Sequence, residues 1–143
     1  NKPYFGVITR TISSQPCTQP MVTDGLSRTL LVSEKRLFSD RYETGDWMDD
    51  RGWSAGWSVD TIRSTGFPPE RDRPSGTPGS VNPAFRKIPK GEYRFGHQFG
   101  SAHVQGIHAL FADGHVQVVD YLVDRDLFNR LGDRRDGKTV GLP

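Results

Sequence analysis

The amino-acid sequence predicts one domain that is mainly β with a small helical part (α+β). Three observations predict this class. The chain has 143 residues, a length that suits a single domain over residues 1–143. Residues 107–121 are two β-prone runs separated by Asp113-Gly114, which is typical of an antiparallel hairpin. Residues 124–131, "DRDLFNRL", have the apolar spacing of a short C-terminal helix.

The hairpin prediction fixes which residues face the core. Asp113 and Gly114 suit the two central positions of a type I′ turn, where both residues need positive φ. Side chains alternate between the two faces of a strand. The predicted core face collects Ile107, Ala109, Phe111, Val116 and Val118, and the opposite face collects His108, Leu110, Ala112, His115, Gln117 and Val119.

The predicted helix has recognisable ends. Asp124 or Asp126 can cap its start, and Gly132 can end it. Its apolar face consists of Leu127, Phe128 and Leu131. We therefore expect this helix to cover one side of the sheet.

Four other segments receive predictions. Residues 4–8 read as an edge strand, and residues 29–32 as a strand buried on both sides, or as a helical segment with Leu26. Residues 57–62 read as a strand that follows a tight turn between Trp53 and Trp57. Residues 64–92 carry six of the ten prolines, so we expect an irregular Pro/Gly-rich excursion there.

Composition excludes several functional classes. The net charge is +2, from 19 basic and 17 acidic residues that are interspersed, so no nucleic-acid partner is expected. Cys17 is the only cysteine, which rules out an intramolecular disulfide. No apolar run approaches the roughly 20 residues that span a bilayer. No G-x-S-x-G elbow is present, and we expect the protein not to be an enzyme.

The histidines raise the question of a metal centre. In the predicted register, His108 and His115 lie roughly 13 Å apart along the ladder, too far to share one zinc ion. A metal-dependent hydrolase would instead need His97 and His103 to converge with Asp113. We therefore expect hydrogen-bonded structural histidines and no transition-metal site.

Calcium is the one cofactor that the sequence suggests, and only weakly. Asp24, Ser27 and Glu34 offer oxygens but match no known calcium loop, so Asp24 is expected to cap a turn and Glu34 to pair with an arginine. A denser acidic group is a better candidate, with pairing to Arg51 and Arg63 as the alternative. Its members are Asp46, Asp49, Asp50 and Asp60.

The three tryptophans fall close together, at Trp47, Trp53 and Trp57. Aromatic side chains concentrate at interfaces, so this region is a possible binding surface for sugar rings or a partner protein. Small domains also use tryptophan to enlarge a thin core, and we expect that for most of the three, with at least one ring partly exposed.

Several motifs occur in an order that resembles a known family. His103, nine residues and Asp113-Gly114 form an H-x9-D-G pattern. The segments "TDGLSRTLLVSEK", which holds Asp24, Gly25 and Glu34, "WSVDTIRSTGFPP" and "DRDLFNRLGDRRDGK" accompany it. Together they resemble a bacterial family of prepilin-like proteins with a domain of unknown function, over residues 23–138. The departures from its pattern are Arg28, Ser33, Val104-Gln105 and His115.

The resemblance implies a function by assembly. Such proteins are similar to type II secretion pseudopilins and type IV pilins, and their precursors are anchored in the inner membrane by a hydrophobic N-terminal helix. This chain would be the C-terminal globular part, located in the periplasm or at the cell surface. Its implied partners are other pilin-like subunits or secretion-system components, and the motif residues named above would be structural. A glycan- or protein-binding module is the alternative, and a metal-dependent hydrolase is a third reading.

Overall fold

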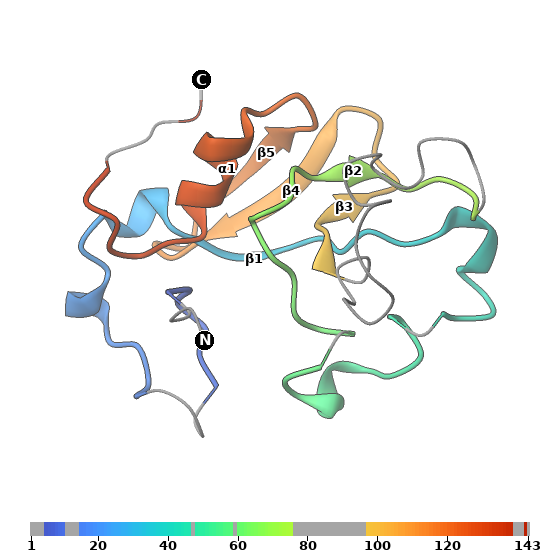
Figure 1. The fold of residues 1–143 in the computed structure, drawn as a ribbon, viewed down its shortest axis with the longest axis horizontal. Coiled ribbons are helices and arrows are strands. Elements are labelled where there is room, and N and C mark those ends of the chain that lie inside the picture. Colours follow the sequence, from blue (N-terminus) through green and yellow to red (C-terminus); the bar gives the residue numbers. More distant parts are fainter. Residues whose placement is uncertain are drawn as a thin grey trace, which may run out of the picture.

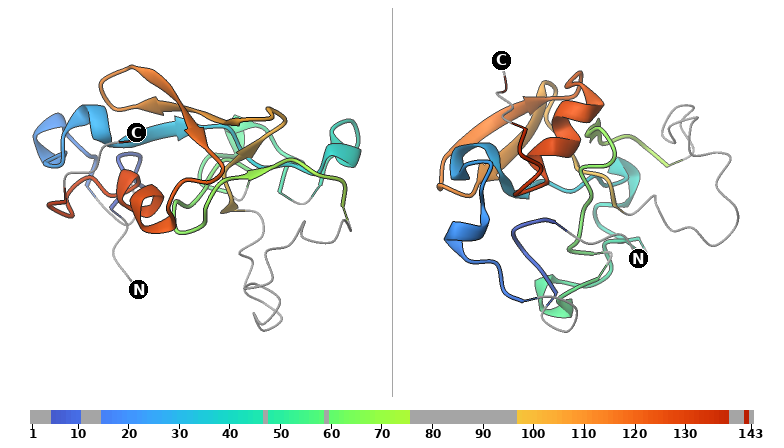
Figure 2. Two further views of the ribbon diagram at one scale, coloured as in Figure 1. Left: turned by 90° about the horizontal axis from the view of Figure 1, so that it is seen from above. Right: turned by 60° about the vertical axis from the view of Figure 1, so that its left-hand side comes forward.

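The structure is a computed structural model that describes residues 5–10, 15–46, 48–58, 60–75, 97–138 and 142. A three-stranded antiparallel sheet in the order β1-β4-β5 forms its centre, and the helix α1 lies against one side of that sheet (Figure 1, Figure 2). These elements are β1 (Leu30–Ser33), β4 (Gly106–Phe111), β5 (Val116–Asp120) and α1 (Arg125–Leu131). The predicted class, antiparallel β with one short C-terminal helix, is confirmed.

A smaller parallel pair joins β2 (Glu70–Arg71) to β3 (Gly100–Ser101). The predicted excursion, residues 64–92, is therefore not wholly irregular, and its residues 76–92 lie outside the described part. The described residues also form the short 3-10 turns η1 (Gln19–Met21), η2 (Leu26–Arg28), η3 (Ser39–Arg41) and η4 (Trp53–Ala55). Among the residues described, no helix is long and apolar enough to cross a membrane.

Two predicted strands are wrong where the structure describes them. Residues 6–8 form a bend instead of an edge strand. In the segment 57–62, residues 57–58 and 60–61 form bends and turns. Asp60 explains the second case, because its carboxylate accepts N–H groups of Asp50 and Arg51 and the Ser58 hydroxyl. Such local side-chain bonds compete with a sheet ladder.

The predicted tight turn before that segment does form. The Gly56 N–H donates to the Trp53 carbonyl over 3.1 Å, and Gly56 has a φ of 67°. The strand at residues 29–32 also forms, as β1. It lies at the edge of the sheet, however, with Val32 49% exposed, so the prediction of burial on both sides is wrong.

The β4–β5 hairpin is closed by three residues, not two. The Phe111 N–H donates to the His115 carbonyl over 3.0 Å, and Ala112-Asp113-Gly114 form the loop. Gly114 has a φ of 95°, whereas none of the non-glycine residues described has a positive φ. A three-residue loop needs the left-handed conformation at glycine alone, while a type I′ turn would impose it on Asp113 as well.

The longer loop shifts the β5 register by one residue and so exchanges its two faces. Ile107 pairs with Val119, and His108 pairs with Val118. Val119 is fully buried, whereas Val116 and Val118 are 61% and 46% exposed. The predicted core positions Val116 and Val118 are therefore wrong, and Val119, which was predicted to lie on the opposite face, belongs to the core.

The core lies between the sheet and α1. Asp124 caps α1 by accepting the Leu127 N–H over 2.9 Å, and Gly132 follows its last residue, both as predicted. The rings of Phe99 and Phe128 meet edge to face at 5.8 Å. The buried apolar cluster consists of Leu30, Phe99, Ile107, Ala109, Phe111, Val119, Phe128 and Leu131.

A β-bulge in β1 decides what the outer side of the sheet carries. Leu30 pairs with Phe111, but Val32 pairs with Leu110, so Leu31 is one extra residue. Leu30 points to the core, and after the bulge Val32 faces outward beside Leu110. The same alternation turns Glu34 to the outer face, next to His108, whose backbone N–H donates to Glu34 Oε2 over 2.7 Å.

The register can be tested by a pair of substitutions. Val119→Ala should lower the free energy of unfolding by about 2 kcal/mol, because it removes two buried methyl groups and leaves a cavity. Val118→Ala, on the exposed side, should cost less than about 0.5 kcal/mol. Urea denaturation measures both values, and a larger loss for Val118→Ala would contradict the observed register.

Candidate functional site

Glu34, His103 and His108 meet on the outer side of the sheet. Glu34 Oε1 lies 3.3 Å from His103 Nε2, and Glu34 Oε2 lies 3.3 Å from His108 Nδ1. The two imidazoles stand edge to face with centroids 4.6 Å apart. Among the described residues this is the one group of three or more potential metal-ligating side chains, with one ligand atom from each within 4.8 Å of the others.

Three separate elements bring this cluster together. Glu34 follows β1 directly, His108 lies within β4, and His103 lies in the loop that joins β3 to β4. The predicted arginine partner of Glu34 is wrong, because the carboxylate faces two histidines instead. Sequence reasoning missed this pairing because it did not show that β1 pairs with β4, and an unbulged β1 would have turned Glu34 toward the core side, opposite Ile107.

The loop that carries His103 is held by its neighbours. Ser101 Oγ accepts the His103 backbone N–H over 3.2 Å. The Tyr121 hydroxyl lies within hydrogen-bond distance of the carbonyl oxygens of Ser101 and His103, at 3.0 and 2.9 Å. Burial raises the pKa of Tyr121, so its hydroxyl stays protonated and able to donate at neutral pH. The cluster is thus built on a braced loop and two paired strands.

The Glu34 carboxylate is ionised at neutral pH. Partial burial works to raise its pKa, but the hydrogen bonds from the His108 backbone and the Ser101 hydroxyl, together with the nearby His103, outweigh burial. The pKa of Glu34 therefore lies below its ordinary value. An ionised carboxylate between two imidazoles can orient protons or hold a cation.

Asp113 and Gly114, the Asp-Gly part of the H-x9-D-G pattern, lie in the hairpin loop and shape it. Asp113 Oδ1 accepts the His115 backbone N–H over 3.1 Å and lies 2.6 Å from His115 Nδ1. These hydrogen bonds lower the pKa of Asp113. The His115 ring also stacks on Phe111, with centroids 4.5 Å apart. Asp113 and Gly114 therefore shape the turn, as the sequence predicted.

The arrangement required for a hydrolase of His97, His103 and Asp113 does not form. His97 Nδ1 faces the Ile62 carbonyl at 3.3 Å, and burial lowers the pKa of His97. Asp113 is engaged with His115, and His103 with Glu34. The three predicted groups are thus held by three different partners.

Asp24 and Gly25 connect the start of the domain to its end. Asp24 accepts the backbone N–H groups of Asp136 and Gly137 over 2.7 and 3.0 Å, so it caps a turn, although one distant in sequence. Gly25 has a φ of 100°, a conformation that favours glycine. Both residues are placed for an architectural role.

The acidic candidates for calcium lie beside basic side chains. Asp46 bonds Arg41 at 2.7 Å, Asp49 bonds Lys35, and Asp50 lies 3.9 Å from Arg51. The buried carboxylate of Asp60 accepts backbone N–H groups instead. Calcium prefers six to eight oxygen ligands, so this paired arrangement gives no support to the calcium prediction.

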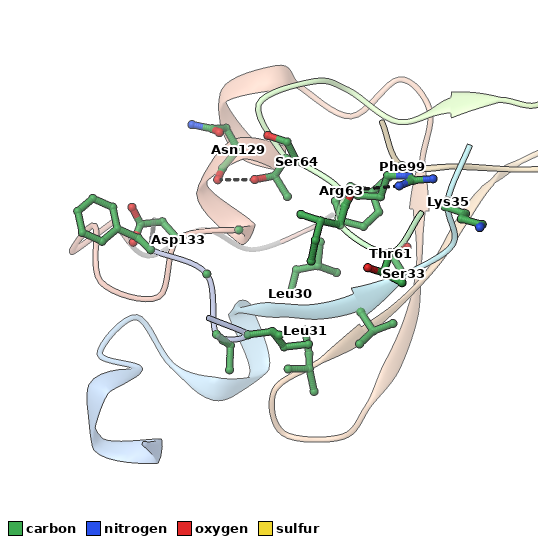
Figure 3. A pocket seen from close by; sticks show the side chains of 18 of the residues that line it. Leu30, Leu31, Ser33, Lys35, Thr61, Arg63, Ser64, Phe99, Asn129 and Asp133 are labelled. Carbon is green, nitrogen blue, oxygen red and sulfur yellow. Dashed lines mark hydrogen bonds between the residues drawn. The ribbon is translucent and has the colours of Figure 1, made fainter. Parts of the chain in front are cut away.

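A cleft of about 940 Å³ runs along β1, including Val32, and is also lined by the segments 5–8 and 60–65 and by the end of α1 (Figure 3). Leu30 and Phe99 line its apolar part, and Arg63 and Asp133 contribute polar groups. Burial lowers the pKa of Arg63 to about 10, so it stays charged at neutral pH.

The tryptophans have different surroundings. Trp53, which also lines the cleft, is 88% exposed, so it does not belong to the core. Trp57 is half-buried, and Trp47 lies outside the described residues. The predicted partly exposed ring is therefore present, at Trp53, but the expectation that the tryptophans enlarge the core is wrong for Trp53 and Trp57, because neither belongs to the buried apolar cluster.

The chain is a small α+β domain with a histidine–carboxylate cluster on its open sheet face. Its residues 10–126 match the model of a family described as a protein of unknown function (DUF1559), and the chain belongs to that family. No curated protein and no solved structure matches it significantly. Family membership therefore assigns no activity to the cluster.

The depressed pKa of Glu34 has a consequence for stability. Its carboxylate stabilises the fold above the ordinary glutamate pKa of 4.5, and this contribution is lost as pH falls through the lower folded-state pKa. Glu34→Gln should therefore be less stable than the wild type at neutral pH, and the difference should shrink below about pH 4.5. Thermal unfolding across pH measures it.

Glu43→Gln, at an exposed glutamate, is the matched control and should show a pH profile close to that of the wild type. A constant difference between Glu34→Gln and the wild type at every pH would contradict this assignment.

Proposed function

We propose that this protein is the globular part of a pilin-like or pseudopilin-like subunit that acts by assembly and not by catalysis. The observation that carries the proposal is the apolar outer face of the β1-β4-β5 sheet. Val32, Val116 and Val118 are 49%, 61% and 46% exposed on it. Leu110 lies between Val32 and Val116 in the same row.

This outer face has the character of an interface. Helix α1 packs on the opposite side of the sheet, where Phe128 and Leu131 are buried (Figure 2). Single exposed apolar residues are common on proteins, but contiguous apolar surface marks sites of interaction. Three exposed valines on β1 and β5, the two strands that flank β4, form such a surface with Leu110 between them, and a neighbouring subunit is the occupant that we propose for it.

The motif order supports the same class. The H-x9-D-G pattern of His103, Asp113 and Gly114 resembles the prepilin-like pattern, and here it shapes the loop that turns Val116 and Val118 outward. On this proposal the partners are pilin-like subunits or secretion-system components, and the location is the periplasm or the cell surface. The domain then takes a pilin-like fold in which the open sheet face meets other subunits.

Site-directed photocrosslinking in cells that make the full gene product tests this proposal. In a Cys17→Ser background, Val118→Cys carries the only thiol within residues 1–143 and is labelled with a benzophenone maleimide. We expect crosslinks from this position to another copy or another pilin-like subunit, identified by mass spectrometry, because the label stands on the proposed interface.

Asp126→Cys, exposed on α1, is the matched control and should give few crosslinks. If labelled Val118→Cys gives no crosslinks, or if both positions give crosslinks equally, the result counts against assembly through this face.

A second candidate function is a binding module for glycans, and the exposure of Trp53 favours it. Tryptophan is rarely left this open without a partner, and a flat indole face suits the apolar side of a sugar ring. Asp49 and Arg51 line the same cleft and offer hydrogen-bonding groups beside the ring.

A glycan array tests this candidate. If it is correct, the wild type binds a defined set of glycans and Trp53→Ala loses at least tenfold in affinity. Leu122→Ala is the control, because Leu122 is 92% exposed but lies away from the residues that line the cleft. An array without hits, or equal losses in both variants, argues against a glycan ligand.

A further inference from the structure

We propose that Glu34, His103 and His108 form a binding site for one zinc-like divalent transition-metal ion. The ligands are His103 Nε2, His108 Nδ1 and the Glu34 carboxylate, which faces His103 with Oε1 and His108 with Oε2. The inference goes beyond the assembly proposal and does not depend on it.

The separations between the donor atoms fit one ion. Zinc lies about 2.0–2.1 Å from imidazole nitrogen and carboxylate oxygen, so two of its ligands at the tetrahedral angle are about 3.3 Å apart. His103 Nε2 lies 3.3 Å from Glu34 Oε1, and His108 Nδ1 lies 3.3 Å from the other oxygen, Oε2. Ligands on opposite sides of such an ion are at most about 4 Å apart. The donor atoms of the whole group lie within 4.8 Å of one another, so up to about 1.5 Å remains to close before they reach the tetrahedral separation.

The donor set selects the class of metal. Two imidazoles and one carboxylate suit zinc, and they are also common around other late divalent transition metals. Calcium and magnesium prefer a shell of oxygens, which this cluster does not offer. Three protein ligands leave at least one coordination position for water or for a group from another molecule.

The surroundings hold the ligands in place before any ion binds. The His108 backbone N–H fixes Glu34 Oε2 at 2.7 Å, which leaves Oε1 toward His103. Tyr121 and Ser101 brace the backbone of the His103 loop. Partners of this kind orient metal ligands, and their loss commonly weakens binding 10- to 100-fold.

The local charge favours a cation. The partly buried carboxylate of Asp72 lies near Glu34, and its pKa is raised first by burial and also by the Glu34 charge. The Tyr42 hydroxyl donates to Asp72 at 2.8 Å, and the Leu37 N–H donates to it at 2.9 Å. Arg36 is the basic group that faces Asp72. A metal ion between Glu34 and the histidines would relieve the repulsion between the two carboxylates.

Zinc titration of the chelator-treated, full-length domain tests the proposal. Isothermal titration calorimetry with zinc chloride should give one site per chain, and zinc should raise the midpoint of thermal unfolding. His103→Ala, His108→Ala and Glu34→Gln should each weaken binding at least tenfold, because each removes a direct ligand.

His115→Ala is the matched control, because His115 also faces a carboxylate, Asp113, but lies outside the cluster. It should bind zinc as the wild type does. Circular dichroism checks that the variants fold. Should a variant fail to fold, NMR of the wild type replaces it, and zinc should then shift the imidazole signals of His103 and His108 but not those of His97 and His115.

The proposal is overturned if the wild type binds no zinc at one-to-one stoichiometry. It is also overturned if binding survives in the His103→Ala/His108→Ala double variant, or if His115→Ala weakens it as strongly. In each case the three side chains form only a hydrogen-bonded group that stabilises the loop.

Discussion

The three-residue loop between β4 and β5 is the constraint on which the rest of the structure depends. Gly114 alone takes positive φ, and the Phe111–His115 hydrogen-bonded pair closes the hairpin. Because side chains alternate along a strand, a loop one residue shorter would reverse every side chain of β5. Val119 would then leave the core, and the two outward valines would enter it. The conformation of this one glycine thus decides which face of β5 packs against α1.

The bulge at Leu31 decides the chemistry of the outer sheet face in the same way. It turns both Val32 and Glu34 outward, so the exposed valines and the histidine–carboxylate cluster adjoin on one face. His108 pairs with Val118 across β4 and β5, which joins the two regions directly. The apolar part carries the proposed subunit contact, and the polar part carries the proposed cation site.

Local signals in the sequence predicted several elements correctly. Asp124 caps α1, Gly132 ends it, and β1 and the hairpin occur where β-prone residues lie next to turn residues. These features depend on hydrogen bonds between residues that are close in the sequence, so a local sequence pattern predicts them. The strands predicted at residues 4–8 and 57–62 do not form among the residues that the structure describes there. In the second segment, Asp60 binds the backbone instead.

The sequence by itself determined the fold class, the place of the turn and the architectural use of Asp24, Asp113 and Gly114. Only the tertiary structure decided which side of each strand is buried and that Glu34 meets two histidines. Glu34 and His108 are 74 residues apart, and their meeting depends on one extra residue in β1. A period-two pattern reports that side chains alternate, but it does not report a one-residue insertion that reverses the alternation. That insertion becomes visible only when the two strands are paired.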